Sequence, residues 1–257
     1  MSGTSMLRRK TKIRLAHLAF VSLFFAALEI LVGSGTISEL ILSRPSKIGT
    51  RLLQDLATSE LWMSLATTVQ EVLVALSLSL LIGTSLGYTF YRFRTFQQAV
   101  EPLLVAFYSA PAILLYPIFV FFLGAGSATV ITMAVILGSV PIAINVAVGF
   151  ASIEPIWRKV GRSLNATPRQ MLFHILVPAA TPTIVTGFRL GLTFALVGVV
   201  ALEFLIYSDG LGKLVSWRYF VFDTDGVYSA IVLVSAIAII INIALTTFDQ
   251  RIRRRWV

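Results

Sequence analysis

The residues that could carry chemistry in this sequence are few, and none is arranged like an active site. The 257 residues include two histidines, His17 and His174, which lie far apart, and no cysteine. There is no nucleophilic Ser/His/Asp grouping, and no glycine-rich loop followed by Lys-Ser or Lys-Thr that could cradle a phosphate. The sequence therefore predicts no catalytic residue, no metal site and no ATP hydrolysis by that route.

A basic segment between two apolar runs, residues 152–182, is the most informative polar stretch. It carries Arg158, Lys159, Arg162 and Arg169, and it contains its own turn and helix caps. A structured basic loop retained on one side of a membrane predicts a surface that holds a partner there.

The first half of this segment predicts a short helix that ends in a defined tip, Leu164–Arg169. Pro155 suits the first turn of a helix, where its missing N–H costs nothing. Asn165 suits a left-handed terminator, because Asn tolerates that backbone conformation better than other non-glycine residues.

The second half predicts another helix, over about 168–176. Thr167 can cap it, with Pro168 in the first position and Gln170 completing a capping box. Because proline restricts the residue before it, we expect Pro178 and Pro182 to mark the boundary with the next apolar run.

The elements that must position this segment are membrane helices. The chain is 57% hydrophobic and only 13% charged, whereas soluble domains carry about 25% charged residues. A helix needs about 20 apolar residues to cross a bilayer. Six segments qualify: Leu15–Gly33, Leu65–Tyr91, Val100–Leu123, Ala128–Phe150, Thr183–Ile206 and Val227–Thr247. We predict an all-α, polytopic membrane protein, with a single transmembrane domain over residues 1–257 and a cytoplasmic loop at 152–182.

The first of these segments follows five cations, as a secretion signal does. Its apolar core is longer than a signal core of about 7–15 residues, so a retained anchor is the favoured interpretation. Between the first two spans, residues 48–62 predict an amphipathic helix lying on the outer membrane surface.

The net charge of +9 is explained by membrane topology and predicts no nucleic-acid partner. With the amino terminus in the cytoplasm, 15 of the 21 Lys and Arg fall on the cytoplasmic side and Arg189 lies within a span. Such a bias predicts that both termini are cytoplasmic.

Prolines interrupt the middle spans. Pro111 and Pro117 fall in the third span and Pro141 in the fourth, and each removes a backbone donor. Freed carbonyls in a membrane must face protein or a wet cavity, which suits a translocation path and a structural kink about equally. The candidate residues of such a path are Pro111, Tyr116, Asn145 and Glu203.

Other residues within the spans favour plainer roles. Glu71 and Arg189 lie nearer the predicted span ends, where a long side chain can reach the interface. An isolated Asn in a membrane helix more often joins helices than binds a ligand. Gly187 and Gly191 have a Gly-x-x-x-Gly spacing, which predicts close helix approach.

The order of these features resembles that of the permease subunits of ABC importers, in the group serving nitrate, sulfonate, taurine, bicarbonate and related solutes. The resemblance covers residues 45–250. The residues that carry it are Leu164-Asn165-Ala166-Thr167 and Ile175-Leu176-Val177-Pro178-Ala179-Ala180, supported by Pro111, Pro117, Pro141, Asn145, Gly149, Gly187-Phe188-Arg189-Leu190, Glu203 and Gly210-Leu211-Gly212.

The resemblance implies a permease that is not itself an enzyme and binds no cofactor. ATP and Mg²⁺ would be bound by a separate ATPase, two copies of which would associate with two permeases as a homodimer or a heterodimer. An extracytoplasmic binding protein would deliver solute, and the whole would sit in the lipid of a bacterial inner membrane. The implied coupling residues are Lys159, Arg162, Leu164, Asn165, Ala166, Thr167, Pro168 and Arg169.

The loop departs from the signature of that group, which opens Glu-Ala-Ala and continues to a Gly. Counting back from the Gly position, Lys159 stands in the acidic position, and Val160 and Gly161 stand in the alanine positions. Asn165 stands in the Gly position, where it can hold the same left-handed turn. The shape of the loop is therefore expected to persist while its charge is reversed.

Two other interpretations remain open at this stage. An autonomous secondary transporter or channel also fits six kinked spans, although carboxylates suited to ion coupling are few and inverted repeats are not evident. A membrane-embedded enzyme is disfavoured because no catalytic cluster is present. A small anionic or aromatic, sulfonate-like solute is expected, without a choice among such solutes.

Overall fold

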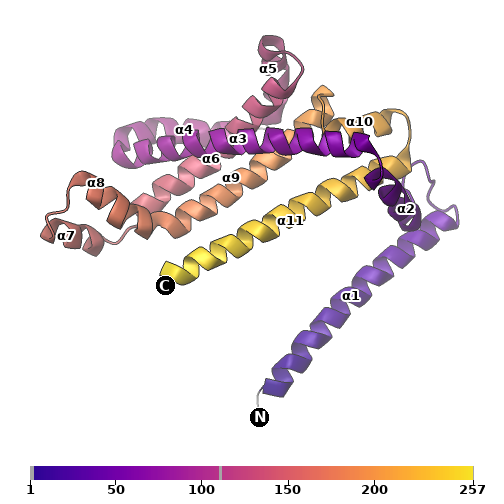
Figure 1. The fold of residues 1–257 in the computed structure, drawn as a ribbon, viewed down its shortest axis with the longest axis horizontal. Helices are drawn as coiled ribbons and strands as arrows, with labels where there is room; N and C mark the ends of the chain where they lie inside the picture. Colours follow the sequence, from indigo (N-terminus) through magenta and orange to yellow (C-terminus); the bar gives the residue numbers. More distant parts are fainter. Residues whose placement is uncertain (1–2, 110–111, 257) are drawn as a thin grey trace.

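The computed structural model describes the backbone of residues 3–109 and 112–256, and the side chains of residues 16, 17, 19–106, 113–243, 246 and 247. Every regular element in these ranges is helical, which confirms the all-α prediction (Figure 1). In chain order they are α1 Gly3–Gly33, α2 Pro45–Leu56, α3 Ser59–Arg92, α4 Arg94–Ser109, a 3-10 turn Ala112–Leu115, α5 Tyr116–Leu123, α6 Ser127–Ala151, α7 Pro155–Ser163, α8 Pro168–Gln170, a π-helical segment Met171–Leu176, α9 Val177–Ile206, α10 Leu211–Phe220 and α11 Thr224–Trp256.

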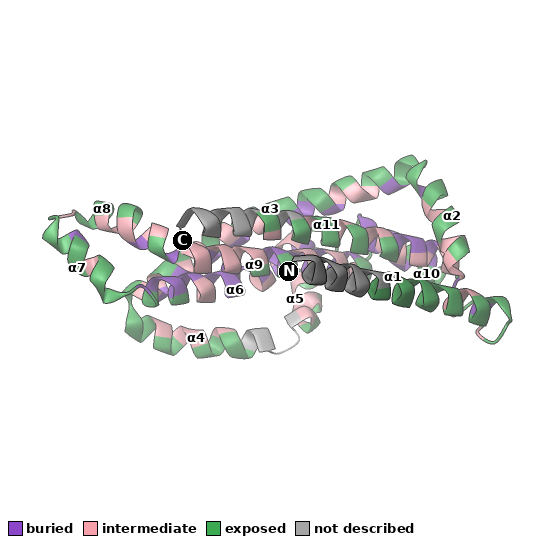
Figure 2. Cartoon of the chain, turned by 90° about the horizontal axis from the view of Figure 1, so that it is seen from below, coloured by how far each residue is buried: buried purple, intermediate pink, exposed green. Residues whose placement is uncertain are grey.

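Three long helices, α3, α6 and α9, form the centre of the molecule (Figure 1). Their shared core contains Ala75, Met133 and Leu202, which are almost fully buried. The helices α7 and α8 project at one end of this bundle, which we term the elbow end. The helices α2 and α10 lie at the opposite end, which we term the far end (Figure 2). The helix α1 meets α2 and otherwise stands apart from the bundle in Figure 1.

Glycines allow the central helices to approach closely. A methyl group placed on Gly87 of α3 would lie 2.5 Å from the carbonyl oxygen of Ala143 and 2.7 Å from Cβ of Val146, both on α6. A methyl group on Gly187 of α9 would lie 2.5 Å from Cβ of Asn145. The close helix approach that the sequence predicts at Gly187 is confirmed.

Four predicted spans correspond to helices that are long and apolar enough to cross a membrane. Among the described residues these helices are Ser59–Arg92, Ser127–Ala151, Pro168–Phe220, which combines α8, the π-helical segment, α9 and α10, and Thr224–Ile243. In α1 the described apolar part, Ala19–Gly33, is shorter than a full crossing. The first span therefore stays a prediction.

The third predicted span, Val100–Leu123, is interrupted, as its prolines predict. The helix α4 ends at Ser109, and α5 starts at Tyr116 and leaves in a different direction (Figure 1). Pro117 lies in the first turn of α5, where its missing N–H costs no hydrogen bond. Proline here begins a new helix and does not kink an existing one.

The expected boundary at Pro178 and Pro182 is wrong, because helical backbone runs without a break from Pro168 to Ile206. Pro178 lies in the first turn of α9, directly after the π-helical segment Met171–Leu176. In a π-helix each N–H donates to the carbonyl five residues back. This change of hydrogen-bond pattern lies directly before Pro178, which has no N–H to donate.

The predicted surface helix at 48–62 is shorter than expected. The helix α2 ends at Leu56, and Trp62 belongs to α3, which begins at Ser59. Thr58 has an extended backbone conformation and separates the two.

Substitution of the close-packed glycine tests this description of the bundle. Gly87→Ala should destabilise the protein by about 1–3 kcal/mol, because the backbone oxygen of Ala143 cannot move away cheaply. The matched control is Gly49→Ala in α2, where the new methyl group has no heavy atom within 4 Å and should be neutral or slightly stabilising. Thermal unfolding in detergent compares the two, and equal midpoints would contradict the close approach.

Candidate functional site

The tip between α7 and α8 has the geometry predicted from the sequence. Asn165 has a φ of 52°, in the left-handed region. Its N–H donates to the carbonyl of Arg162 (3.0 Å), and the N–H of Ala166 donates to the carbonyl of Gly161 (3.0 Å). These two bonds form a Schellman motif, which satisfies carbonyls that a helix end leaves free. The turn is therefore fixed by backbone hydrogen bonds.

The capping box that follows the tip is confirmed. The N–H of Thr167 donates to Oε1 of Gln170 (2.9 Å), and the N–H of Gln170 donates to Oγ1 of Thr167 (3.4 Å). Pro168 occupies the first turn of α8, as expected. Both sides of the tip are thus capped by residues within five positions of it.

Gly161 lets the two arms of the elbow pack together. It is buried, and a methyl group at this position would lie 2.6 Å from Cε of Met171 and 2.7 Å from Cδ1 of Ile175. A larger side chain would push α7 away from the π-helical segment. The elbow is therefore a packed unit of α7, the tip and residues 168–176.

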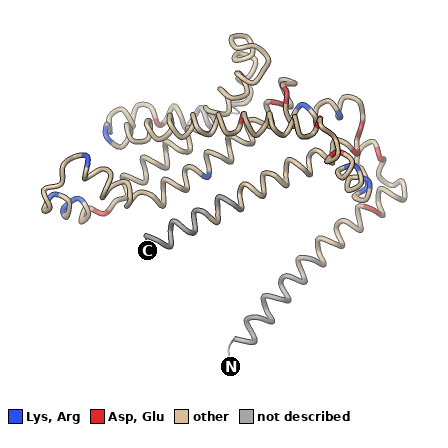
Figure 3. Tube along the Cα trace, in the orientation of Figure 1, with Lys and Arg blue, Asp and Glu red and all other residues tan. Residues whose placement is uncertain are grey.

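The outer surface of α7 exposes a row of large apolar side chains, which we call the elbow face. Ile156, Trp157, Val160 and Leu164 are 42–74% exposed, Leu164 most of all. Lys and Arg gather around them, as Figure 3 shows for the elbow end. The elbow thus presents apolar groups flanked by positive charge: the exposed cations are Lys159, Arg162 and Arg169.

Arg158 joins the elbow to the bundle, although the sequence indicates it only as one of the cations of the basic segment. The guanidinium of Arg158 lies 5.6 Å from the ring centre of Tyr91, and its Nη2 donates to the carbonyl of Phe150 (3.2 Å). The rings of Tyr91 and Phe150 are stacked at 5.1 Å. The residues near Arg158 in the sequence do not indicate this contact, because Tyr91 lies far from Arg158 along the chain.

The predicted path residues are not brought together. Asn145 donates to the carbonyl of Pro141 on its own helix (2.8 Å) and packs against Gly187. Glu203 lies 16 residues beyond Gly187 on α9, about 24 Å along the helix. Tyr116 packs at the edge of the central core, and Pro111 lies outside the described residues.

Glu203 holds the far end together. Its carboxylate is fully buried and accepts from Oγ1 of Thr68 (2.7 Å) and from the N–H of Gly212 (2.8 Å). Oγ1 of Thr68 in turn accepts from the N–H of Leu211 (2.9 Å). Two free donors at the start of α10 are thereby satisfied.

The interpretation of Glu71 as a residue at a span end is wrong. Its side chain is 2% exposed and packs within the bundle. Glu71 lies on α3 at the level where Thr68 meets Glu203, and it is directed inward with its neighbours on that face of the helix.

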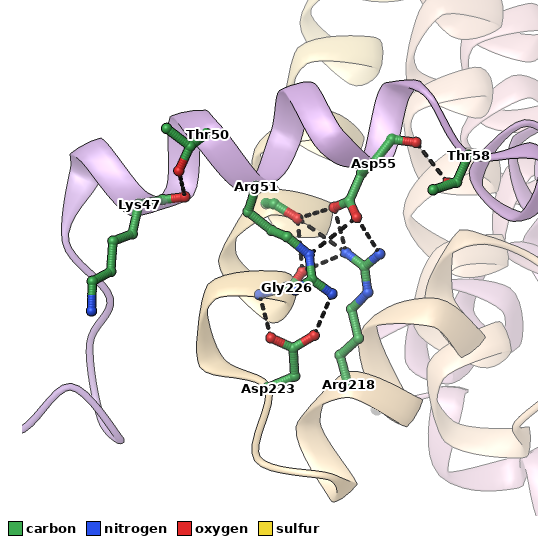
Figure 4. Close-up of polar contacts among 9 residues, drawn as sticks. Lys47, Thr50, Arg51, Asp55, Thr58, Arg218, Asp223 and Gly226 are labelled. Carbon is green, nitrogen blue, oxygen red and sulfur yellow. Dashed lines mark hydrogen bonds and ion pairs between the residues drawn. The ribbon is translucent and has the colours of Figure 1, made fainter.

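A buried ion pair, which sequence reasoning missed, joins three elements of the far end (Figure 4). Arg218 of α10 donates from Nη1 to Oδ2 of Asp55 and from Nη2 to Oδ1, both at 2.7 Å. Nη1 also donates to the carbonyl of Gly226 (2.9 Å) and to Oγ of Ser229 (3.0 Å) on α11. Asp55 and Arg218 are 4% and 7% exposed.

Arg51 extends this pair into a network. Its Nε lies 3.2 Å from Asp55 Oδ1, and its Nη2 lies 2.6 Å from Asp223 Oδ2. Burial alone raises the pKa of the Asp55 carboxyl, but the hydrogen bonds from Arg218 and Ser229 and the charges of Arg218 and Arg51 lower it below its usual value. The network therefore favours the ionised carboxylate.

Comparison with known proteins places this geometry in context. Residues 79–254 match the family described as "Binding-protein-dependent transport system inner membrane component". The formylaminopyrimidine transport permease protein of Halalkalibacterium halodurans is 30% identical over 200 residues, 78% of this chain and 80% of that protein. The taurine transport system permease protein of Escherichia coli is 26% identical over 221 residues, 84% of this chain and 80% of that protein.

A solved structure shares the fold. A chain of the MetNI methionine ABC transporter in an inward-facing conformation superposes with a TM-score of 0.66 at 21% identity. The match covers 75% of this chain and 96% of that one.

Removal of the buried carboxylate tests the far-end ion pair. Asp55→Asn should cost about 3–5 kcal/mol, because Arg218 is left buried without its counter-charge. The control is Asp209→Asn, which breaks the exposed pair with Lys213 and should cost at most about 1 kcal/mol. Thermal unfolding at neutral pH distinguishes the two variants.

The pH dependence of the same difference has a definite sign. A carboxylate whose pKa is lowered on folding stabilises the protein above its unfolded pKa of about 3.9, and this contribution is lost as pH falls through the lowered pKa. The gap between wild type and Asp55→Asn should therefore shrink only under acid conditions. A gap that is constant down to the lowest accessible pH would contradict the assignment.

Proposed function

The chain belongs to the family of inner membrane components of binding-protein-dependent transport systems, and from this membership we propose that its elbow is the docking surface for the ATPase of the transporter. The protein is a multi-pass inner-membrane permease of an ABC importer, similar to permeases of the nitrate, sulfonate and taurine group. ATP is handled by a partner ATPase, so the permease is not itself an enzyme. An autonomous transporter or channel is no longer a competing interpretation.

The elbow face is the observation that carries the docking proposal. Large apolar side chains exposed on a soluble part of a protein mark an interaction surface, and the elbow exposes Trp157 and Leu164 beside Lys159 and Arg162. A partner groove that is apolar at its centre and acidic at its rim would match it. Lys159 in the position usually held by an acid implies an ATPase whose facing charge is also changed.

The continuity of α9 supports a mechanical role for the elbow. Helical backbone from Pro168 to Ile206 spans on the order of 55 Å. One end of it packs against Gly161 in the elbow, and Glu203 at the other end holds α10. A displacement imposed on the elbow by the ATPase would therefore reach the far end through a single rigid element.

We infer that the elbow end is cytoplasmic and that the chain crosses the membrane six times. The helices α1 and α11 both adjoin α2 and run as single helices from the far end. Two such helices would leave both termini on the side of the elbow. The excess of Lys and Arg in the corresponding segments agrees with the rule for cytoplasmic loops.

We infer further that two permeases and two ATPases assemble. The helix α1 stands apart from its own bundle and exposes Phe20, Leu23 and Phe24 (Figure 1). These side chains suit lipid or a second permease. That second permease would be either another copy of this chain or a related permease.

The binding protein would approach the far end. A hollow of about 520 Å³ opens there between the start of α3 and α10, and its lining includes Glu60, Tyr207, Lys213 and Trp217. Solute released at this end would enter the bundle in which Tyr116, Asn145 and Glu203 lie, with Asn145, beside Gly187, about 24 Å from Glu203 along α9. These residues and Pro111 remain proposed members of the path.

The proposed topology predicts the labelling of single cysteines. The chain contains no cysteine, so Ser163→Cys in the elbow and Ser38→Cys in the 34–44 connection need no background removal. In intact spheroplasts a membrane-impermeant maleimide should label position 38 and not position 163, and lysis should expose position 163. Labelling of position 163 in intact spheroplasts would show that the elbow faces the outside, and it would contradict the proposed orientation.

Charge reversal at the tip tests ATPase docking. Ala166→Asp combined with Arg169→Glu should abolish co-purification of the ATPase and uptake while membrane insertion is unchanged, because it places two acids beside the elbow face. Asn165→Gly is the control at the same tip, since glycine keeps the left-handed turn without strain. Wild-type association by the double variant would overturn the coupling assignment.

A further inference from the structure

Two buried carboxylates face each other inside the far end of the bundle, those of Glu71 on α3 and Glu203 on α9. The two residues are 2% and 0% exposed. Glu203 accepts hydrogen bonds from Thr68 and from the N–H of Gly212, whereas no described residue forms a hydrogen bond of good geometry with either oxygen of Glu71. The fold therefore leaves Glu71 as a buried polar group without a donor, which is costly.

The neighbouring membrane helices do not balance the charge of this pair. The helix α6, which packs against both α3 and α9, contains no charged residue and contributes only the neutral hydroxyl of Ser127 beside Glu71. On α3 the basic residue, Arg92, lies about 32 Å from Glu71 along the axis. On α9 the basic residue, Arg189, lies about 21 Å from Glu203.

The charged groups of α10 and of the connection before it are already paired. Asp209 faces Glu71 and adds a further negative charge, and it forms an ion pair with Lys213 (2.6 Å). Arg218 is held by Asp55. Among the described side chains, the ion pairs of the far end include neither of the two buried glutamates.

One proton resolves the conflict between the two acids. An ionised carboxylate can only accept hydrogen bonds, so two ionised carboxylates that face each other cannot bond. Like charges this close inside a protein cannot both form without a large cost. The N–H groups at the start of α10 favour the charge on Glu203. A proton on Glu71 would then turn the contact into a charge-assisted O–H···O bond and satisfy the buried group.

The pair lies directly behind the hollow at the far end. Gly210 lines this hollow of about 520 Å³. It has no room for a side chain, because Oε1 of Glu203 lies against it, and its φ of 130° also favours glycine. A single glycine therefore separates the carboxyl group of Glu203 from the hollow.

We propose that Glu71 and Glu203 form a proton-binding site of the permease: one proton, exchanged through the far-end hollow, joins α3 to α9 where α10 begins. On release the proton passes to water in the hollow and leaves two carboxylates that repel each other. The proposal goes beyond the proposed function, and only the side from which the proton arrives depends on the proposed topology.

The consequence of proton release is a looser far end. The first N–H groups of α10, on Leu211 and Gly212, are held by Thr68 and Glu203. Repulsion between the two carboxylates would separate α3 from α9 and release these N–H groups. Acid at the far end would thus favour its closed form, and alkaline conditions its open form.

Infrared spectroscopy of the whole chain in phosphatidylcholine nanodiscs detects the proton directly. At neutral pH the wild type should show the C=O stretching band of a protonated carboxyl group, and the band should disappear as the pH is raised. Glu71→Gln should lack the band at neutral pH, because the amide N–H of glutamine donates to Glu203 in place of the proton. Glu60→Gln, at an exposed position on the same helix, is the matched control and should keep the band.

The unfolding midpoint reports whether the proton joins the helices. The midpoint of the wild type should fall over the pH range in which the band disappears, whereas that of Glu71→Gln should not. Ser208→Cys reports on the far end itself, because Ser208 is buried and the chain has no other cysteine. At one alkaline pH, which keeps thiol reactivity equal, a maleimide should label this cysteine several-fold faster in the wild-type background than in Glu71→Gln.

Three results would overturn the shared proton. They are absence of the carboxyl band from the wild type at neutral pH, an undiminished band in Glu71→Gln, and a wild-type midpoint that falls when sodium is replaced by choline, which would assign the pair to a metal cation. If Glu71→Gln does not fold, the wild type decides alone, because its band and its midpoint must change over the same pH range. The tip variant Ala166→Asp with Arg169→Glu should keep the band, and Glu71→Gln should still co-purify with the ATPase, so the two proposals can fail separately.

Discussion

Close contact between the backbones of α3, α6 and α9 is the constraint on which the other features of this permease depend. In a bilayer the apolar side chains gain little by leaving lipid for protein, so helices associate where their backbones approach closely. At one crossing, a methyl group on Gly138 of α6 would lie 3.0 Å from the carbonyl oxygen of Gly191, and one on Gly191 would lie 2.9 Å from that of Gly138. Glycine at both positions lets the two helices touch directly.

This contact gives α9 a fixed position from which both ends of the protein can be organised. At the elbow end, the same helical stretch packs against Gly161 and shares a core with Phe150 and Leu176. At the far end it places Glu203 under the first N–H groups of α10. Since α10 also carries Arg218, the position of α9 determines where the buried ion pair with Asp55 can form.

A feature of this protein can be predicted from the sequence when its interacting groups lie close together along the chain. The turn at Asn165 and the box formed by Thr167 and Gln170 were predicted because their donors and acceptors lie within five residues. Asp55 and Arg218 lie 163 residues apart, and nothing near either residue indicates the other. The elbow's shape is thus a local property, whereas its attachment through Arg158 to Tyr91 is not.

The errors in the prediction have similar physical causes. Pro178 was expected to end a helix, but a π-helical segment before it shifts the hydrogen-bond pattern, and helix types of this kind leave no mark in apolar periodicity. Glu71 was expected at an interface because it lies near an end of the predicted span, where a long side chain can reach the membrane surface. Its burial depends on α6 and α9 covering α3, which is a consequence of the glycine crossings and not of its neighbours in sequence.

Arg218 and Arg189 differ in both the burial and the charge of the groups around the guanidinium. Arg218 has a carboxylate with two matched hydrogen bonds, a carbonyl and a hydroxyl, so its charge is balanced within the fold and its contribution is structural. Arg189 has one neutral oxygen. Among the described residues the fold supplies no balancing charge for it, and its hydrogen bond joins α9 to α11.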